Sequence, residues 1–91
     1  MDEKKLGADL IAAERKRQIE IGYSASHDHQ HSESEFMRAA MAYLYAAMGR
    51  NEDARDAWCW DESCFKPKDI ARNLVKAGAL IAAAIDRLHE Q

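Results

Sequence analysis

The stretch near the end of the chain most constrains the fold, because it predicts a long helix with an apolar centre over about residues 67–89. Apolar side chains recur there every three or four residues, which places them on one helical face: Ile70, Leu74, Ala77, Ile81, Ala84 and Leu88. Pro67 is expected in the first helical turn, where its missing N–H is tolerated. Residues 77–85 carry no polar side chain. We therefore expect this helix to be buried on every side, by other helices of the chain or by a second subunit.

Composition favours a small soluble helical domain. The chain has 91 residues with 47% apolar and 32% charged residues and one proline, which is typical of an ordered globular protein. A net charge of −3 argues against general nucleic-acid binding. The apolar run at 77–85 is far shorter than the ~20 residues that cross a bilayer, and the first ten residues lack the apolar region of a signal peptide. No membrane association and a cytoplasmic location are expected.

Two further helices are predicted over about residues 5–21 and 32–48, which with a long connection at 49–66 makes residues 1–91 one all-α bundle. Ser32 and Glu35 form an S-x-x-E capping box before an apolar run, and Gly49 is placed to end that helix. The apolar side chains of the second helix form a wide face: Phe36, Met37, Ala40, Met41, Tyr43, Leu44, Ala47 and Met48. Because small domains often gain stability by oligomerising, we expect a homo-oligomer through the second and third helices.

The first helix places a carboxylate among apolar positions. Glu14 and Gln18 share a face with Ile11 and Ile21, whereas Arg15, Lys16 and Glu20 point elsewhere. A carboxylate on an inward face costs free energy unless it is paired or binds a cation. The pattern leaves three alternatives: an ion pair to Arg72 or Arg87, a helix rotated so that Glu14 reaches water, or a metal site. Further carboxylates near helix faces suit Mg²⁺ or Mn²⁺: Asp28, Glu35 and Asp86.

A second metal hypothesis concerns zinc. His27, His29 and His31 alternate in a polar connection, with Cys59 and Cys64 as further ligand types. The spacings match no standard zinc pattern, so a solvated histidine-rich loop is favoured and zinc is not expected. The two cysteines are expected to be free thiols.

The connection at 49–66 carries both tryptophans. Asn51 is expected to begin a short helical turn. Trp58 and Trp60 flank Cys59 and would face the same way in an extended segment. Two such indoles can cover the core, which is the favoured interpretation, or stack on a planar ligand such as a base.

Six sequence pieces, in this order, resemble a family of small phage and prophage proteins grouped with the MazG-like all-α nucleotide pyrophosphohydrolases, some of which resemble dATP/dGTP diphosphohydrolases. The resemblance covers roughly residues 11–88. The pieces are E-R-x-x-Q (14–18), G-Y followed by H-D (22–28), E-F-x-x-A-A-x-x-Y (35–43), W-x-W (58–60), K-P (66–67) and L-V-K-A-G-A-L-I-x-A-x-I-D-R-L (74–88).

The resemblance implies a hydrolase that uses Mg²⁺ to split (deoxy)nucleoside triphosphates into monophosphate and pyrophosphate. It implies catalytic roles for Glu14 and Glu35, with metal ligands drawn from Glu14, Asp28, Glu35 and Asp86. It also implies phosphate contacts from Lys66 and Lys76, with Arg87 as a further candidate, and base stacking by Trp58 or Trp60.

This chain departs from the family pattern at Ala84, where relatives commonly carry a glutamate. The departure keeps a second hypothesis open: a non-catalytic prophage protein that retains the fold and binds a nucleotide or a protein partner. The tryptophan piece also has Cys59 where proline is usual, and the loss of that proline makes the segment less rigid.

Overall fold

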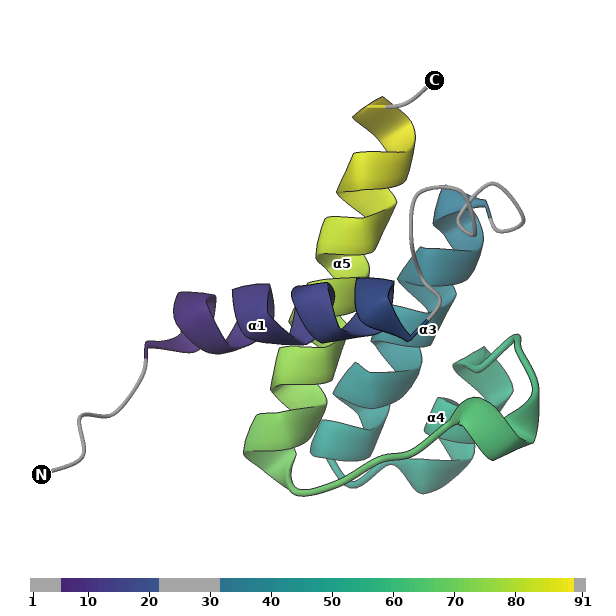
Figure 1. Cartoon of the computed structure of the whole chain (residues 1–91). Helices are drawn as coiled ribbons and strands as arrows, with labels where there is room; N and C mark the ends of the chain where they lie inside the picture. Colours follow the sequence, from purple (N-terminus) through teal and green to yellow (C-terminus); the bar gives the residue numbers. More distant parts are fainter. Residues whose placement is uncertain (1–5, 22–31, 90–91) are drawn as a thin grey trace, which may run out of the picture.

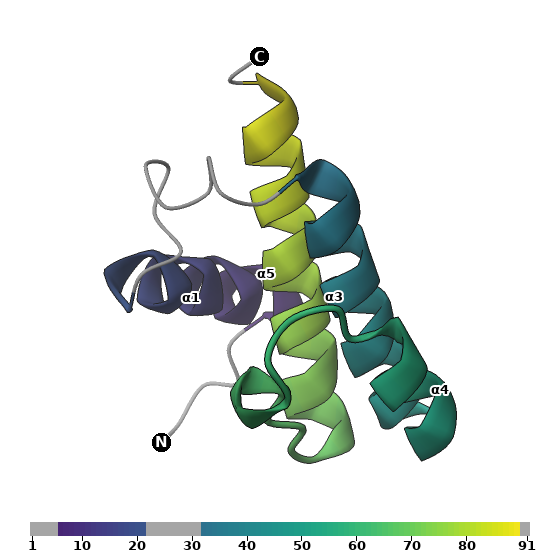
Figure 2. The same cartoon turned by 90° about the vertical axis from the view of Figure 1, so that its right-hand side faces the viewer.

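Two long antiparallel helices, α3 (Glu33–Ala47) and α5 (Ile70–His89), form the centre of the fold (Figure 1). The computed structural model describes residues 6–21 and 32–89. Helix α1 (Gly7–Glu20) crosses this pair, and the short helix α4 (Asn51–Ala57) lies beside the end of α3 (Figure 2). A single 3-10 turn, Glu62–Cys64, precedes the approach to α5. Residues 6–21 and 32–89 contain no strand, so the prediction of an all-α fold is confirmed, and no helix among them is long and apolar enough to cross a membrane.

Both ends of α3 follow the predicted capping chemistry. The Ser32 hydroxyl accepts a hydrogen bond from the backbone N–H of Glu35 at 3.2 Å, which satisfies one of the unpaired donors of the first turn. At the other end Gly49 adopts a φ of 79°. Its N–H donates to the carbonyl of Ala46, and the next N–H, of Arg50, donates to the carbonyl of Tyr45. This pair of hydrogen bonds ends the helix. It requires a backbone conformation that glycine adopts without strain.

Helix α5 begins later than predicted, at Ile70, so Pro67 lies before the helix and not in its first turn. The side chain of Asp69 accepts a hydrogen bond from the N–H of Arg72 at 2.8 Å and so caps the helix. The Asn73 amide meanwhile accepts from the N–H of Lys68 at 2.6 Å and donates to its carbonyl at 3.0 Å. The Asn73 side chain thus pairs both backbone polar groups of Lys68, which fixes the approach of the chain to the helix.

The core lies between α3 and α5 and is closed by the segment after α4. It contains ten buried apolar residues: Phe36, Ala39, Ala40, Ala42, Tyr43, Trp58, Ala77, Leu80, Ala83 and Ala84. Six of the ten are alanines. Small side chains allow two helix backbones to approach closely, so the alanine-rich faces of α3 and α5 pack against each other directly.

The other helices of this chain bury only part of the surface of α5, so the predicted burial on every side would need a second subunit as well. Of its predicted stripe only Ala77 and Ala84 are buried, and the large members are about half exposed. The exposed set on α5 comprises Ile70, Leu74, Ile81, Ile85 and Leu88. The cause is that α3 packs on the alanine-rich side of α5. The exposed leucine and isoleucine side chains lie on a neighbouring side of the helix, which α3 does not cover.

Helix α1 packs against α5 through a small residue and a charged one. Gly78 leaves room for Ile11, because a Cβ at that glycine would lie 2.6 Å from Ile11 Cδ1. Arg15, predicted to point away from the core, is only 8% exposed, and its Nε donates to Asp86 at 3.4 Å. The aliphatic part of an arginine can cover a neighbouring helix while its guanidinium reaches a carboxylate, which explains the difference.

Candidate functional site

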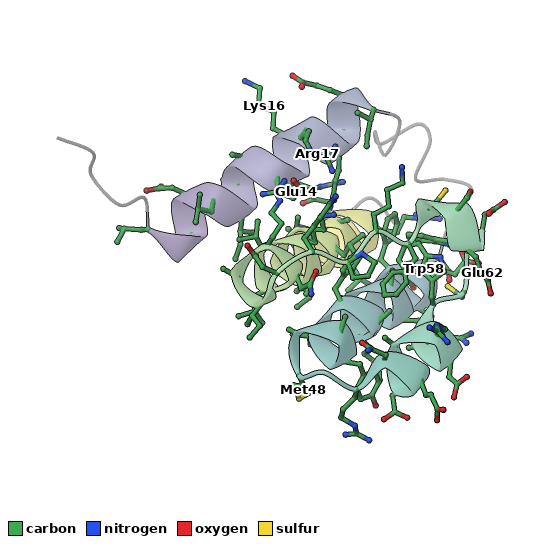
Figure 3. The ribbon with its side chains drawn as sticks, turned by 90° about the horizontal axis from the view of Figure 1, so that it is seen from below. Glu14, Lys16, Arg17, Met48, Trp58 and Glu62 are labelled. Atoms are coloured by element: carbon green, nitrogen blue, oxygen red, sulfur yellow. The ribbon has the colours of Figure 1, made fainter. Side chains whose placement is uncertain are left out.

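A cavity of about 600 Å³ lies where α1 meets α3, α5 and the segment between α4 and α5. The side chains on its walls come from all of these elements, so the cavity exists only in the folded chain. Among the described residues its walls are formed by Glu14, Arg17, Gln18, Ile21, Tyr43, Trp58, Trp60, Ser63, Cys64, Lys66, Lys76 and Leu80. Figure 3 shows Glu14 and Arg17 on the side of α1 that faces the rest of the molecule, while Lys16 extends away from it.

Glu14 is the centre of an ion-pair network on the α1 side of the cavity. Its side chain is 0% exposed and accepts hydrogen bonds from Arg17 Nε at 2.9 Å and Arg17 Nη2 at 2.8 Å. Arg72 Nη2 and the amide Nε2 of Gln18, the latter at 3.2 Å, also donate to its carboxylate. Of the alternatives stated from sequence, the ion pair to Arg72 is therefore the arrangement that the structure contains, with Arg17 as a second partner.

The electrostatics of Glu14 follow from these contacts. Burial alone would raise the pKa of Glu14, but the hydrogen bond and charge of Arg17, together with the charge of Arg72 and the Gln18 bond, lower it below its ordinary value of 4.5. Glu14 is thus ionised at neutral pH. Its negative charge is matched locally by two guanidinium groups.

Lys66 and Lys76 bring positive charge to the other side of the cavity. Lys76 is only 7% exposed, and its Nζ donates to the backbone carbonyl of Lys66 at 2.6 Å. The Nζ atom also lies 5.4 Å from the centre of the Tyr43 ring, a cation–π distance. Burial lowers the pKa of Lys76, and the nearby charge of Glu14 partly opposes this effect.

Aromatic rings form a continuous wall of the cavity. Trp58 meets Tyr43 edge to face at 5.7 Å and meets Trp60 in the same way at 5.3 Å. The indole N–H of Trp58 donates to the carbonyl of Asp61 at 2.9 Å, which fixes the orientation of the ring. The two interpretations of the tryptophan pair are not exclusive, because Trp58 belongs to the core and both indoles line the cavity.

The structure gathers some of the predicted site residues and separates others. Glu14 and the four residues predicted for substrate binding all lie on the cavity walls: Lys66, Lys76, Trp58 and Trp60. Glu35 and Asp86 do not line it. Glu35 lies near Trp60, whose Nε1 is 3.5 Å from its carboxylate. Asp28 and the three histidines of the zinc hypothesis lie outside the described residues.

Ala84, the position at which the sequence departs from the pattern that it resembles, is 3% exposed and belongs to the core between α3 and α5. It does not line the cavity. A carboxylate at this position would lie in the apolar core, unpaired in this arrangement, and would be costly to bury. Alanine therefore suits the packing of this chain.

To coordinate Mg²⁺, the Glu14 carboxylate would have to exchange its present partners. Mg²⁺ requires near-octahedral oxygen coordination, and the Glu14 carboxylate is already engaged by Arg17, Arg72 and Gln18. Within residues 6–21 and 32–89, no three side chains of the His, Cys, Asp or Glu types are grouped to hold a metal ion. The zinc candidates Cys59 and Cys64 are free thiols, and Cys59 Sγ donates to the carbonyl of Glu35.

Several residues of the cavity were not singled out as site residues from sequence, among them Arg17, Gln18 and Tyr43. Arg17 lies three residues after Glu14, a spacing that joins opposite charges on one helical face, so the pair could have been found. Gln18 was placed on the correct face, but its Oε1 is enclosed and has no hydrogen-bond partner among residues 6–21 and 32–89. Because Gln18 Nε2 donates to Glu14, the orientation of this amide is set by the carboxylate.

Comparisons of the chain with protein-family models, with curated proteins and with solved structures find no match.

Proposed function

We propose that the cavity binds a nucleoside phosphate, with the phosphates on its cationic side chains and the base against its aromatic wall. The observation that carries the proposal is the composition of one cavity of about 600 Å³, in which, among the described residues, three cationic and three aromatic side chains meet a single carboxylate. A cavity of this size suits a small organic ligand. Neither half of the wall alone would specify a nucleotide, but the two together match its two chemical parts.

The charges favour an anion. Arg17, Lys66 and Lys76 line the cavity against one carboxylate, Glu14, and that carboxylate also pairs with Arg72 outside the lining set. The local balance is therefore positive, although the whole chain is acidic. Arginine and lysine side chains donate charge-assisted hydrogen bonds to phosphate oxygens.

The aromatic wall favours a planar group. Trp58 is 9% exposed and is held by core contacts, whereas Trp60 is less buried and packs edge to face on both Trp58 and Phe36. An ordered indole presents a rigid surface for a base, and such stacking contributes about 1–3 kcal/mol per base. Hydrolysis to monophosphate and pyrophosphate, implied by the family resemblance, is a separate proposal that product analysis of the same samples tests.

Titration calorimetry with a panel of nucleoside and deoxynucleoside triphosphates tests the binding site. The matched variants are Lys66→Gln and Lys68→Gln: both lysines are exposed, but only Lys66 lines the cavity. Loss of one charge-assisted contact should weaken binding about tenfold in Lys66→Gln, while Lys68→Gln should bind like the unaltered protein. A folded protein that binds no nucleotide, or two variants with equal affinity, would contradict the proposal.

We further propose that a second copy of the chain covers the exposed apolar faces of α3 and α5. Eight large aliphatic side chains there are each between 44% and 64% exposed: Met37, Met41, Met48, Ile70, Leu74, Ile81, Ile85 and Leu88. On α3 the exposed residues Met37 and Met41 each follow a buried one, and on α5 Ile81 and Ile85 do the same. Each exposed residue is therefore rotated by about 100° around its helix from the buried residue before it. Because α3 and α5 are antiparallel (Figure 1), this rotation places the exposed side chains of both helices on the same side of the helix pair.

The size of this face suits a dimer. Helix α5 has 20 residues, so the face is about 30 Å long, and two helices of about 10 Å diameter make it about 20 Å wide. That footprint of roughly 600 Å² approaches the accessible area of about 800 Å² that each partner buries in a stable interface. A two-fold axis would place the apolar face against itself, with no like charges among these eight side chains.

Sedimentation equilibrium tests the dimer. Ile81→Arg places a charge in the middle of the proposed interface and should shift the protein to a monomer, because an unpaired charge cannot be buried there. Ala12→Arg adds the same charge at an exposed position of α1 and should leave the mass unchanged. A monomeric parent protein would refute the second-copy proposal without touching the nucleotide site.

A further inference from the structure

We propose that α1 is a movable wall of the cavity, which detaches from α5 far more often than the whole chain unfolds. Figures 1 and 2 show α1 lying across one side of the α3–α5 pair, so it can leave without disturbing the contact between those two helices. The opening gives ligands access to the cavity. It is a property of the fold and does not depend on which ligand the cavity binds.

Helix α1 buries no apolar side chain. Its buried residues are all polar or charged: Glu14, Arg15 and Gln18. Ile11 is only partly buried, Leu10 and Ile19 are exposed, and none of the ten core residues belongs to this helix. Because burial of apolar surface is the dominant favourable contribution to folding, α1 is held less firmly than α3 or α5.

Ion pairs join α1 to α5. Arg72 donates to the buried carboxylate of Glu14, and Arg15 Nε lies 3.4 Å from a carboxylate oxygen of Asp86, whose side chain is 53% exposed. Detachment returns these charges to water, which solvates ions well and so offsets part of the lost attraction. Leaving α5 therefore costs α1 less than leaving the apolar core would cost α3.

Helix α1 also depends on this packing for its helical structure. No side chain caps its first turn at Leu6, whereas Ser32 caps α3. A helix of 14 residues is only marginally stable in water on its own. Once detached, α1 loses its helical hydrogen bonds, and its backbone amides exchange with solvent.

The opening changes the cavity directly. The wall that leaves with α1 comprises Glu14, Arg17, Gln18 and Ile21. Its departure opens the side of the cavity opposite Lys76, a residue that is only 7% exposed in the closed form. A ligand that contacts both sides would hold the wall closed, because it binds the closed form in preference to the open one.

Hydrogen–deuterium exchange of the full chain, followed by mass spectrometry of its peptides, tests the opening. The amides of residues 7–20 should exchange at least about tenfold faster than the slowest amides of α3 and α5, because local opening costs less than global unfolding. Exchange as slow as in those two helices would overturn the proposal.

Gly78→Ala separates detachment of α1 from loss of the whole fold. A Cβ at Gly78 would lie 2.6 Å from Ile11 Cδ1 and so pushes α1 away, whereas alanine favours the helical conformation of α5 itself. Exchange in residues 7–20 should rise roughly fivefold or more, the low end of what overpacking costs, and exchange at the centre of α5 should not rise. Gly7→Ala makes the same change where nothing lies within 4 Å and should speed exchange in neither helix. An unchanged α1 in Gly78→Ala, or equal acceleration of α1 and α5, would overturn the proposal.

A nucleotide connects the opening to the proposed function, and this last step rests on the nucleotide-binding proposal. A nucleoside triphosphate that binds in calorimetry should slow exchange in residues 7–20 by about tenfold at ten times its Kd. Binding without such slowing would overturn the role of α1 as a wall of the occupied site. If no nucleotide binds, the nucleotide-binding proposal fails, while exchange in the unaltered protein and in Gly78→Ala still decides whether α1 opens.

Discussion

Replacing Glu14 by glutamine should destabilise the fold, because it removes the charge that holds two arginines between α1 and α5. Removing one partner from a buried ion pair typically costs 3–5 kcal/mol. Here the carboxylate is fully buried but the guanidinium groups are 48% and 39% exposed, so water recovers part of their solvation and the cost falls to about 2 kcal/mol. For a domain of this size, about 2 kcal/mol lowers Tm by roughly 10 °C.

The effect also has a defined pH dependence. The pKa of Glu14 is lowered in the folded protein relative to its ordinary value of 4.5, so the unfolded chain binds a proton there more readily than the folded one. The stabilisation is fully present above pH 4.5 and is lost as the pH falls through the lower folded pKa. The difference in stability between the unaltered protein and Glu14→Gln should therefore be constant near neutral pH and shrink in acid.

Urea unfolding followed by far-ultraviolet circular dichroism measures both effects, at one protein concentration because a dimer would couple stability to concentration. Glu20→Gln makes the same chemical change at an exposed position of the same helix and should alter stability by less than about 0.5 kcal/mol. Equal stability of the two variants at pH 7, or a difference that grows in acid, would refute the assignment of Glu14 as the ionised centre of this network.

Two other predictions concern the cap of α5 and the cysteines. Asp69→Ala should cost about 1 kcal/mol in urea unfolding, because the hydrogen bond to the N–H of Arg72 is lost; Asp69→Asn should retain most of the stability, and equal losses in both would argue against capping. Burial raises the pKa of Cys59 above its ordinary value of 9.0, so iodoacetamide should alkylate it more slowly than the exposed Cys64, as peptide mass spectrometry of timed samples would show. The two rates should converge in urea, and equal rates in the native protein would contradict the burial of Cys59.

Much of the secondary structure could be predicted because its causes are local. The hydroxyl of Ser32 and the conformational freedom of Gly49 act within one turn of the helix that they bound, and both act as predicted. The start of α5 was placed too early, because Pro67 is compatible with a first turn but does not require one. The capping carboxylate of Asp69 and the hydrogen bonds of Asn73 decide the boundary.

Some residues of the cavity were predicted as binding residues from the family resemblance, but their arrangement in space was not predicted. Lys66, Lys76 and Trp60 are separated along the chain, and only the packing of the last connection against α3 and α5 brings them together. Glu14 was predicted to face inward, yet the sequence left its partner open between an arginine, water and a metal ion.

The sequence by itself determined that this chain forms helices, where α3 begins and ends, and that Glu14 faces inward, because these features depend on contacts within a few turns. The tertiary structure decided that Arg72 meets Glu14, because that contact joins residues 58 positions apart and depends on how α1 crosses α5. It also decided that the alanine face of α5 is buried in the chain while Ile81 and its large neighbours remain exposed. The run at 77–85 is apolar on every side and carries no local signal to choose among its faces, so the helices that pack against it decide which face is buried.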